Sequence, residues 1–199
     1  MAAGVTWKPK RKAGAFSGGD LASGEVGLDT TNGVWYYSPD GSTVTALGGG
    51  GKVAQVVTTE DSTVKTSTVS FPLDTSIPQN TDGDAYSELD TTITPTNAGS
   101  SLLVLVSLSF SGTATSSPHA AVFRDSGSDA LRTKMVTHAA GWHSNLDFSF
   151  SLPAGSTAAT TFKIRYGRQS GTLYVNSGTA TAFFGGTLFS SLTIMEILP

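Results

Sequence analysis

The 199-residue chain contains no cysteine, and only 14% of its residues are charged, against about 25% in an average globular protein. The absence of cysteine excludes a disulfide framework, a thiolate nucleophile and cysteine-ligated zinc or iron–sulfur sites. Long hydrophobic runs are also absent, since the longest, residues 102–106, is far too short to cross a bilayer. The start of the chain does not read as a secretory signal peptide, because its charges follow its apolar residues. We therefore expect no membrane insertion, and synthesis in a cytoplasm.

Serine, threonine and glycine take the place of the missing charge. The chain has 26 serines, 28 threonines and 23 glycines. Threonine is β-branched and favours strands, whereas serine and glycine favour turns. The composition therefore predicts an all-β protein.

Basic residues are concentrated at the start of the chain, next to Trp7. The first twelve residues include no acidic side chain and four basic ones, which are Lys8, Lys10, Arg11 and Lys12. Subtracting these four from the 12 lysines and arginines leaves 8 basic against 15 acidic residues, so nucleic acid is not an expected partner. We interpret residues 1–19 as an extended basic arm that either docks onto an acidic protein surface or is disordered.

A run of four glycines divides the chain and predicts a linker over residues 48–52. The preceding segment, 20–47, contains two turn signals between β-prone runs, Asn32-Gly33 and Pro39-Asp40-Gly41. These signals predict a small β meander. Its length of about 30 residues provides too little core to stand alone, so we expect identical copies or a larger partner to stabilise it.

Residues 53–199 show strand signals at the spacing of an antiparallel sandwich of jelly-roll type. Alternation of apolar and polar residues is clear in 146–152 and 162–166, and no stretch keeps a helical period, so we expect no helix longer than a turn. The predicted strands cover 53–57, 63–71, 86–93, 102–110, 120–124, 131–137, 146–152, 160–166, 172–175, 179–183 and 188–197.

The last predicted strand is apolar on both faces, which would be an aggregation hazard at an open sheet edge. We therefore expect it to lie centrally in its sheet and to pack against neighbouring subunits. The residues expected at that interface are Leu192, Ile194, Glu196 and Ile197.

Several segments resemble those of short bacteriophage fibre and virion proteins. Residues 190–197 resemble their closing strand, 91–104 their second structural repeat, and 162–176 their penultimate strands. Their last domain is a trimeric jelly roll related to the knobs of complement C1q and tumour necrosis factor. Residues 24–41 resemble the small β-prism that begins phage tropism determinants and tail fibres.

This resemblance implies a homotrimer on the particle surface, made in a bacterial host cytoplasm, whose N-terminal part attaches to other virion structural proteins and whose knob points outward. The tail and the head both remain open as its position. A capsid decoration or cement protein without a receptor role is the alternative. The residues expected to anchor it are Trp7, Lys8, Lys10, Arg11, Lys12, Trp35, Tyr36 and Tyr37.

The loop 141–145 is the best candidate for ligand binding. An aromatic ring between glycine, histidine and asparagine offers a flat apolar face with hydrogen-bonding neighbours, which suits sugar rings of a host cell-surface polysaccharide. The alternative is that its tryptophan lies in the core or between subunits. The residues expected at this receptor site are Trp142, His143, Asn145, Tyr174 and Asn176.

Metal ligands are not indicated. The three histidines, His119, His138 and His143, have no recognised ligand spacing. Residues Asp82 and Asp84 lie in a segment that imitates the first half of a calcium loop, but the bidentate acid expected further along is missing. We expect no metal and no cofactor, and leave calcium at this segment open.

Catalytic motifs are also weak. Residues 125–129 contain carboxylates and hydroxyls, but they read as a hairpin turn, and the chain has no Gly-x-Ser-x-Gly elbow. Glu196 would have a raised pKa if it were buried alone, and Arg165 or Arg168 is its expected partner. The chain is therefore expected not to be an enzyme.

Overall fold

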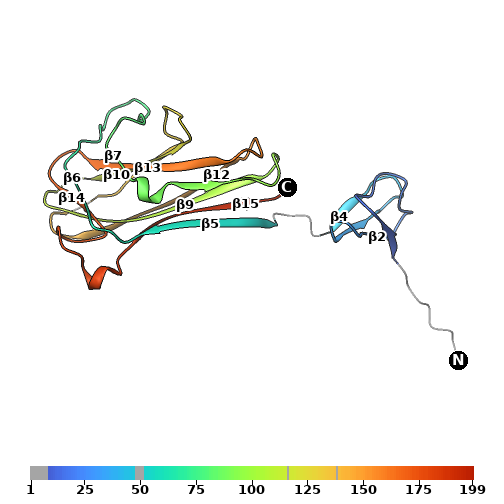
Figure 1. The fold of residues 1–199 in the computed structure, drawn as a ribbon. Helices are drawn as coiled ribbons and strands as arrows, with labels where there is room; N and C mark the ends of the chain where they lie inside the picture. Colours follow the sequence, from blue (N-terminus) through green and yellow to red (C-terminus); the bar gives the residue numbers. More distant parts are fainter. Residues whose placement is uncertain (1–8, 48–51, 116, 138) are drawn as a thin grey trace. The chain divides into compact units, whose positions relative to one another are not determined.

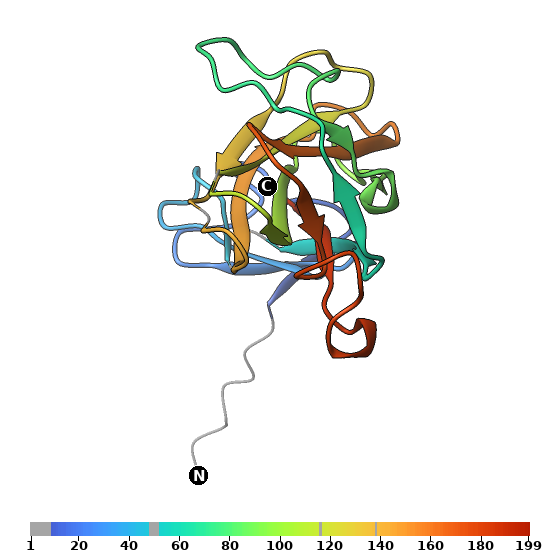
Figure 2. The same cartoon turned by 90° about the vertical axis from the view of Figure 1, so that its left-hand side faces the viewer.

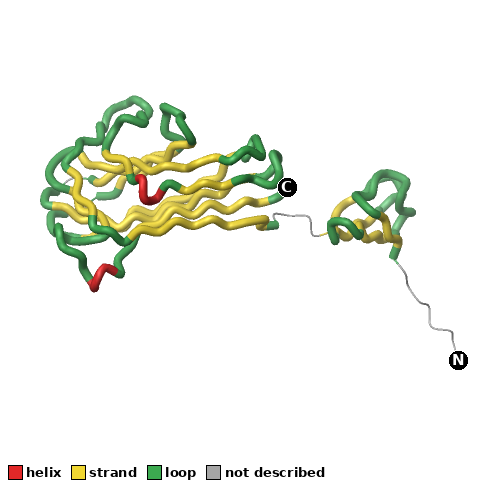
Figure 3. Tube along the Cα trace, in the orientation of Figure 1, coloured by secondary structure: helices red, strands yellow, loops and turns green. Residues whose placement is uncertain are grey.

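The computed structural model describes residues 9–47, 52–115, 117–137 and 139–199, so Trp7, Lys8, the glycines 48–51 and His138 lie outside the described residues. The chain forms two compact units, one ending at Lys52 and the other spanning Val53–Leu198. The described part is all-β, as expected, and its helical segments are two short 3-10 turns, η1 (Ser87–Leu89) and η2 (Phe184–Gly186) (Figure 3). None of its helices is long and apolar enough to span a bilayer.

The N-terminal unit is a four-stranded sheet in the order β1 (Lys10–Lys12), β2 (Val26–Asp29), β3 (Val34–Tyr37) and β4 (Thr45–Leu47). The hairpin turn predicted at Asn32-Gly33 is confirmed, because β2 and β3 pair antiparallel around it and Gly33 has a φ of +68°. Asp29 fixes this turn, since its buried carboxylate accepts hydrogen bonds from the backbone N–H of Thr31 (2.8 Å) and the side-chain amide of Asn32 (2.7 Å).

The core of this unit is small, as its length predicts. Phe16 and Leu21 are its buried apolar side chains, and they pack over Gly27 of β2. A Cβ atom at Gly27 would lie 2.6 Å from Cζ of Phe16, so a larger residue there would displace Phe16 and Leu21. Tyr36 adds to the cluster, with its ring centroid 5.6 Å from that of Phe16.

We predicted that residues 1–19 form a basic arm separate from this unit. For residues 10–19, which the structure describes, this prediction is wrong. Lys10–Lys12 form β1, which pairs parallel with β2. Lys12 Nζ lies 2.7 Å from a carboxylate oxygen of Asp20, and Lys10 Nζ lies 3.0 Å from one of Glu25. The hydrogen bond from Lys12 is the main cause that lowers the pKa of Asp20 to about 2. These two lysines are therefore paired within the unit.

The C-terminal unit, which we call the knob, is a sandwich of two antiparallel sheets (Figures 1 and 2). The five-stranded sheet has the order β11 (Arg132–Met135), β10 (Pro118–Arg124), β13 (Thr160–Arg168) and β7 (Asp84–Ala85), with β8 (Thr91–Ile93) also paired to β13. The six-stranded sheet contains β5 (Val53–Asp61), β15 (Ser190–Ile197), β9 (Ser101–Gly112), β14 (Leu173–Val175) and β6 (Lys65–Ser67), with β12 (His143–Pro153) on the other side of β9.

The knob core fills the space between the sheets. Along β12 the apolar residues Leu146, Phe148 and Phe150 pack on this core, while Asp147 and Ser149 between them are exposed, which confirms the predicted alternation. Burial of this kind stabilises by about 25 cal/mol for each Å² of apolar surface removed from water. Two strand predictions are wrong: residues 179–183 are an irregular loop, and 86–93 divide into η1 and β8.

The pairing of the strands distinguishes two ends of the knob. Val53, the first residue of β5, lies opposite Ile197, the last residue of β15, so the chain enters the knob at the same end at which β15 finishes. At the other end Asp61 lies opposite Ser190, and His143 of β12 lies opposite Ser111 of β9. We call this second end, which lies away from the C-terminus in Figure 1, the distal end.

Candidate functional site at the distal end of the knob

Exposed aromatic side chains gather on two loops of the distal end. Trp142 is 73% exposed, Phe184 is 79% exposed and Phe189 is 50% exposed. The two loops touch through His143, whose ring centroid lies 5.4 Å from that of Phe183. We call these residues the distal aromatic cluster: Trp142, His143, Phe183, Phe184 and Phe189.

The loop that carries Phe184 is held in a strained conformation. Phe184 has a φ of +50°, and Gly185 and Gly186 follow with φ of +66° and +84°. A bulky residue rarely adopts positive φ, at a cost of about 1–3 kcal/mol, and such strain is concentrated at functional sites. The Thr187 hydroxyl, which donates to the Phe184 carbonyl oxygen at 2.9 Å, helps to hold this turn.

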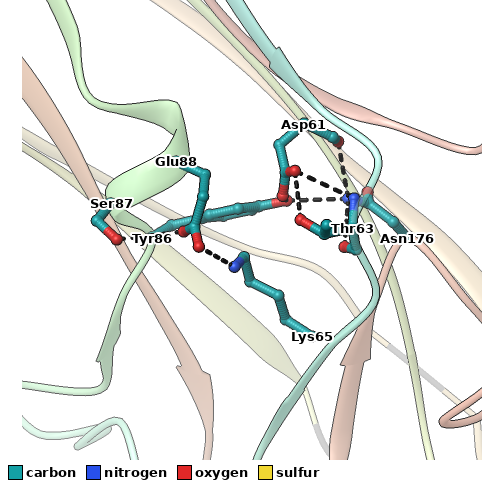
Figure 4. A network of polar contacts seen from close by, with 7 residues as sticks. All are labelled: Asp61, Thr63, Lys65, Tyr86, Ser87, Glu88 and Asn176. Atoms are coloured by element: carbon teal, nitrogen blue, oxygen red, sulfur yellow. Dashed lines mark hydrogen bonds and ion pairs between the residues drawn. The ribbon is translucent and has the colours of Figure 1, made fainter.

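A buried polar network fixes the base of the same loop (Figure 4). The amide nitrogen of Asn176 lies within hydrogen-bonding distance of the carbonyl oxygens of Asp61 (2.8 Å) and Thr63 (3.1 Å) and of Tyr86 Oη (2.9 Å). Its amide oxygen accepts from the Ser190 hydroxyl at 2.7 Å. Asn176 is fully buried, so its predicted role in receptor binding is wrong: it joins the start of the loop to β5 and β15.

Tyr86 completes this network. Its hydroxyl donates to the Asp61 carboxylate at 2.9 Å, and burial, followed by this bond, raises the pKa of Tyr86 far above its ordinary value. The phenol therefore remains a donor throughout the physiological range. Lys65 forms an ion pair with Glu88, and its Nζ lies 5.4 Å from the centre of the Tyr86 ring, so this ion pair lies against the ring (Figure 4).

The other four predicted receptor residues differ in how far they are exposed to solvent. Trp142, His143 and Asn145 are exposed, so the alternative that Trp142 lies in the protomer's core is wrong. Tyr174 is half-buried on β14, between Ser111 of β9 and Thr66 of β6. The sequence reasoning missed Phe183, Phe184 and Phe189. The paired glycines after Phe184 were the available signal for an exposed turn.

The last strand β15 is central, as predicted, because it pairs with β5 on one side and β9 on the other. Its predicted interface residues need correction, since Leu192, Ile194 and Glu196 are fully buried within the same protomer. The alternating residues Met195 and Ile197 point to the opposite, outer face of the sheet.

Glu196 has polar partners other than the expected arginines. Its carboxylate accepts from the backbone N–H of Thr96 (2.9 Å) and Asn97 (3.1 Å), from the Ser100 hydroxyl (2.7 Å) and from the Gln55 amide (2.7 Å). Burial favours the neutral acid, but these hydrogen bonds outweigh it and lower the pKa of Glu196 to about 2. Glu196 is therefore buried but not alone, and it holds the 96–100 turn against the sheet.

Arg165 and Arg168, the expected partners of Glu196, donate hydrogen bonds to backbone carbonyl oxygens instead. Arg168 is buried, and its guanidinium donates to the carbonyl oxygens of Thr172 (2.8 Å) and Ala114. Arg165 donates to the carbonyl oxygens of Asp82 and Gly83, each at 2.6 Å. The positive guanidinium against this turn disfavours a calcium ion at Asp82 and Asp84.

The outer face of the six-stranded sheet is apolar toward the end where the chain enters. Val56 lies directly opposite Met195, which lies opposite Leu103, and Val53 lies opposite Ile197. Directly opposed residues share one face of a sheet. We call this set the outer apolar face, and it consists of Val53, Val56, Leu103, Leu105, Met195 and Ile197. Val53, Val56 and Leu105 are 44%, 53% and 37% exposed.

The structure also places the residues that were weighed as metal ligands and as hydrolytic groups. The described part of the chain contains no group of three histidine, aspartate or glutamate side chains that could hold a metal ion. Asp125, in the turn weighed for hydrolysis, accepts from the Thr160 hydroxyl and the Thr161 backbone N–H, both at 2.8 Å. Its role there is to close the turn.

No protein-family model and no curated protein matches this chain. Among solved structures it is similar to Eiger TNF from S. frugiperda, at 8% identity over 74% of this chain and 94% of that chain, with a TM-score of 0.45. It is also similar to infectious bursal disease virus, Gx strain (14% identity, TM-score 0.36), and to the VP2 subviral particle of that virus (12% identity, TM-score 0.34). Each of the two viral matches covers 78% of this chain. This chain spans 40% of the length of the first viral chain and 42% of the second.

Proposed function

We propose that this chain is a non-enzymatic phage virion structural protein, a homotrimeric fibre or spike of the tail or head. Its N-terminal part attaches it to other virion proteins, and its knob attaches to carbohydrate on the host surface. The observation that carries the proposal is the distal aromatic cluster, which lies at the end of the knob opposite Val53, where the chain enters.

The chemistry of this cluster suits a sugar chain. Aromatic faces pack against the C–H faces of sugar rings, and polar groups beside them fix the orientation of the hydroxyls. Trp142 offers an indole ring that is 73% exposed, and the exposed His143 and Asn145 stand beside it. The polar network at Asn176 and Ser190 holds both ends of the loop that carries Phe183 and Phe184, which reduces the entropy that this loop loses on binding.

Self-association is supported by the outer apolar face. Its exposed valines and leucine are apolar side chains that a second copy would remove from water, and contiguous apolar patches mark interaction sites. In the proposed trimer the interface is therefore formed by Met195 and Ile197 of β15, not by Leu192, Ile194 or Glu196.

Anchoring is assigned to the N-terminal unit. Trp35 on β3 is 38% exposed and Tyr37, on the same face of the strand, is half-buried, whereas Tyr36 packs on Phe16 on the opposite face and is not part of the proposed surface. Large amphipathic rings are enriched where proteins dock onto one another. Arg11 is exposed on β1 and belongs to the same proposed anchoring surface.

Replacing Trp142 by alanine tests the attachment role. Loss of an aromatic anchor typically costs about 2 kcal/mol, so W142A is expected to bind host cells or their purified polysaccharide about 30-fold more weakly. The measurement is the concentration of purified protein that blocks adsorption of the particle, with the oligomeric mass checked by light scattering.

W35A is the matched control, because it removes the same residue type from the N-terminal unit. It is expected to weaken binding to the particle and leave binding to polysaccharide unchanged. If wild-type protein binds only particles and raises their resistance to heat, the attachment role is wrong and the chain is a decoration protein.

A further inference from the structure

His119 is buried on the outer face of the five-stranded sheet. Along β10, Ala120 and Val122 face the knob core, so His119 faces the other way. Only 2% of its surface is exposed. Residues 69–78, which we call the cover segment, lie over it, and the ring of Phe71 stacks on the imidazole with the two ring centroids 5.8 Å apart.

The cover segment has few hydrogen bonds to the sheet, and these lie near its ends. At one end the Phe71 backbone N–H donates to the Arg168 carbonyl oxygen at 3.0 Å, and at the other the Pro78 carbonyl oxygen accepts from the Ala130 N–H at 2.9 Å. Residues 72–77 between them make no backbone–backbone hydrogen bond within the described part of the chain. A segment held in this way can open while the strands beneath it stay paired.

Apolar contacts keep the cover segment closed. Phe71 forms a small cluster with Ala121 and Phe123 of β10, separate from the knob core. The segment lies close to the sheet at Gly167, which is opposite His119, because a Cβ atom there would lie 3.0 Å from Cβ of Phe71. Opening of the segment would therefore expose the cluster and the imidazole together and leave the knob core intact.

The closed segment accommodates only the uncharged imidazole. Neither Nδ1 nor Nε2 of His119 makes a hydrogen bond within the part of the chain that the structure describes. Burial lowers the pKa of His119 below its ordinary value of 6.5. The protonated ring carries two N–H donors and a charge, and a buried charge without a partner is far less stable than one in water.

The charged side chains around His119 do not provide a counter-ion for the protonated ring. The cover segment contributes Asp74 and the turn before β7 contributes Asp82, and each carboxylate accepts from a backbone N–H of its own turn. Strand β11 contributes Lys134 and strand β13 contributes Arg165, both of which repel a positive imidazolium. None of these four groups hydrogen-bonds to the imidazole.

We propose that the cover segment is acid-sensitive and detaches from the five-stranded sheet when the His119 imidazole takes up a proton. Detachment allows water to solvate both N–H groups of the imidazolium. The open form binds the proton more readily, so the closed form is fully stable above pH 6.5 and is progressively destabilised as the pH falls below that value. The proposal does not depend on the proposed function of the distal aromatic cluster.

Hydrogen exchange of the whole chain, followed by NMR between pH 7.5 and pH 5, tests this proposal. Each exchange rate is divided by the rate of an unstructured peptide at the same pH, so that the ratio reports opening alone. At pH 7.5 the Phe71 amide is expected to be at least about 100-fold less protected than the amides of β15, and to lose roughly a further tenfold by pH 5. Protection equal to that of β15, or no change with pH, would overturn the proposal.

H119F keeps an aromatic ring against Phe71 but cannot take up a proton. Protection of its Phe71 amide is expected to be the same at pH 7.5 and pH 5. If H119F does not fold, H119Q gives the same test, since its side chain does not titrate either. D74N removes the other titratable group of the cover segment and is the matched control, which should keep the tenfold change. Persistence of the change in the His119 variants, or its loss in D74N, would overturn the proposal.

Discussion

Replacing Glu196 by alanine is expected to lower the Tm of the knob by roughly 10 °C. The variant leaves the donors of Thr96, Asn97, Ser100 and Gln55 without their buried acceptor. Each unsatisfied buried donor costs about 1–3 kcal/mol, and partial entry of water limits the total to about 3 kcal/mol. For a domain of this size, 1 kcal/mol shifts the Tm by about 2–4 °C. Differential scanning calorimetry measures the change.

Acid provides an independent readout of the same carboxylate. The folded pKa of Glu196 is about 2, below the ordinary value of 4.5. Its contribution to stability is therefore complete above pH 4.5 and is lost as the pH falls from 4.5 toward 2. E196A is expected to lack this part of the acid response. E60A, at an exposed position on the neighbouring strand, is the control and should change the Tm by less than about 1 °C. A similarly small change for E196A would contradict the assigned role.

Replacing Leu105 by lysine is expected to dissociate the proposed trimer. Leu105 lies on β9 opposite Thr193 of β15, beside the outer apolar face's other members, and is 37% exposed in the protomer. Association would bury three ammonium groups, one from each copy, in an apolar interface, and removing a charge from water there costs several kcal/mol. The dissociation constant is expected to rise at least about 100-fold, which sedimentation equilibrium measures.

The folded protomer is expected to survive this change, because Leu105 points out of the sandwich and the knob core is untouched. Near-ultraviolet circular dichroism should therefore match that of the wild type. T157K places the same charge on the exposed turn between β12 and β13 and serves as the control. If T157K and L105K had the same oligomeric mass, the outer apolar face would not be the interface.

Local patterns predicted much of the fold. Alternation over 146–152 identified β12 and its buried face, because one side of the strand packs on the core and the other is exposed. Asn32-Gly33 identified the hairpin of the N-terminal unit, because Gly33 needs positive φ. Segment 179–183 has strand-forming residues but no strand partner, and pairing depends on the whole topology, not on the segment.

The candidate site was only partly predictable for the same reason. Trp142 was identified from its polar and glycine neighbours, which favour an exposed turn. Asn176 reads the same way in the sequence, but three distant segments meet around it and bury it. The partners of Glu196 are likewise about 100 residues away along the chain, so no spacing rule indicates them.

Sedimentation equilibrium of the whole, unmodified chain tests the central claim most directly. A concentration series near neutral pH is expected to give a single species of three times the chain's mass, stable to dilution into the low micromolar range. A protein that stays monomeric throughout this range would contradict the account, because the outer apolar face would then be exposed to water and the proposed trimeric fibre or spike could not form.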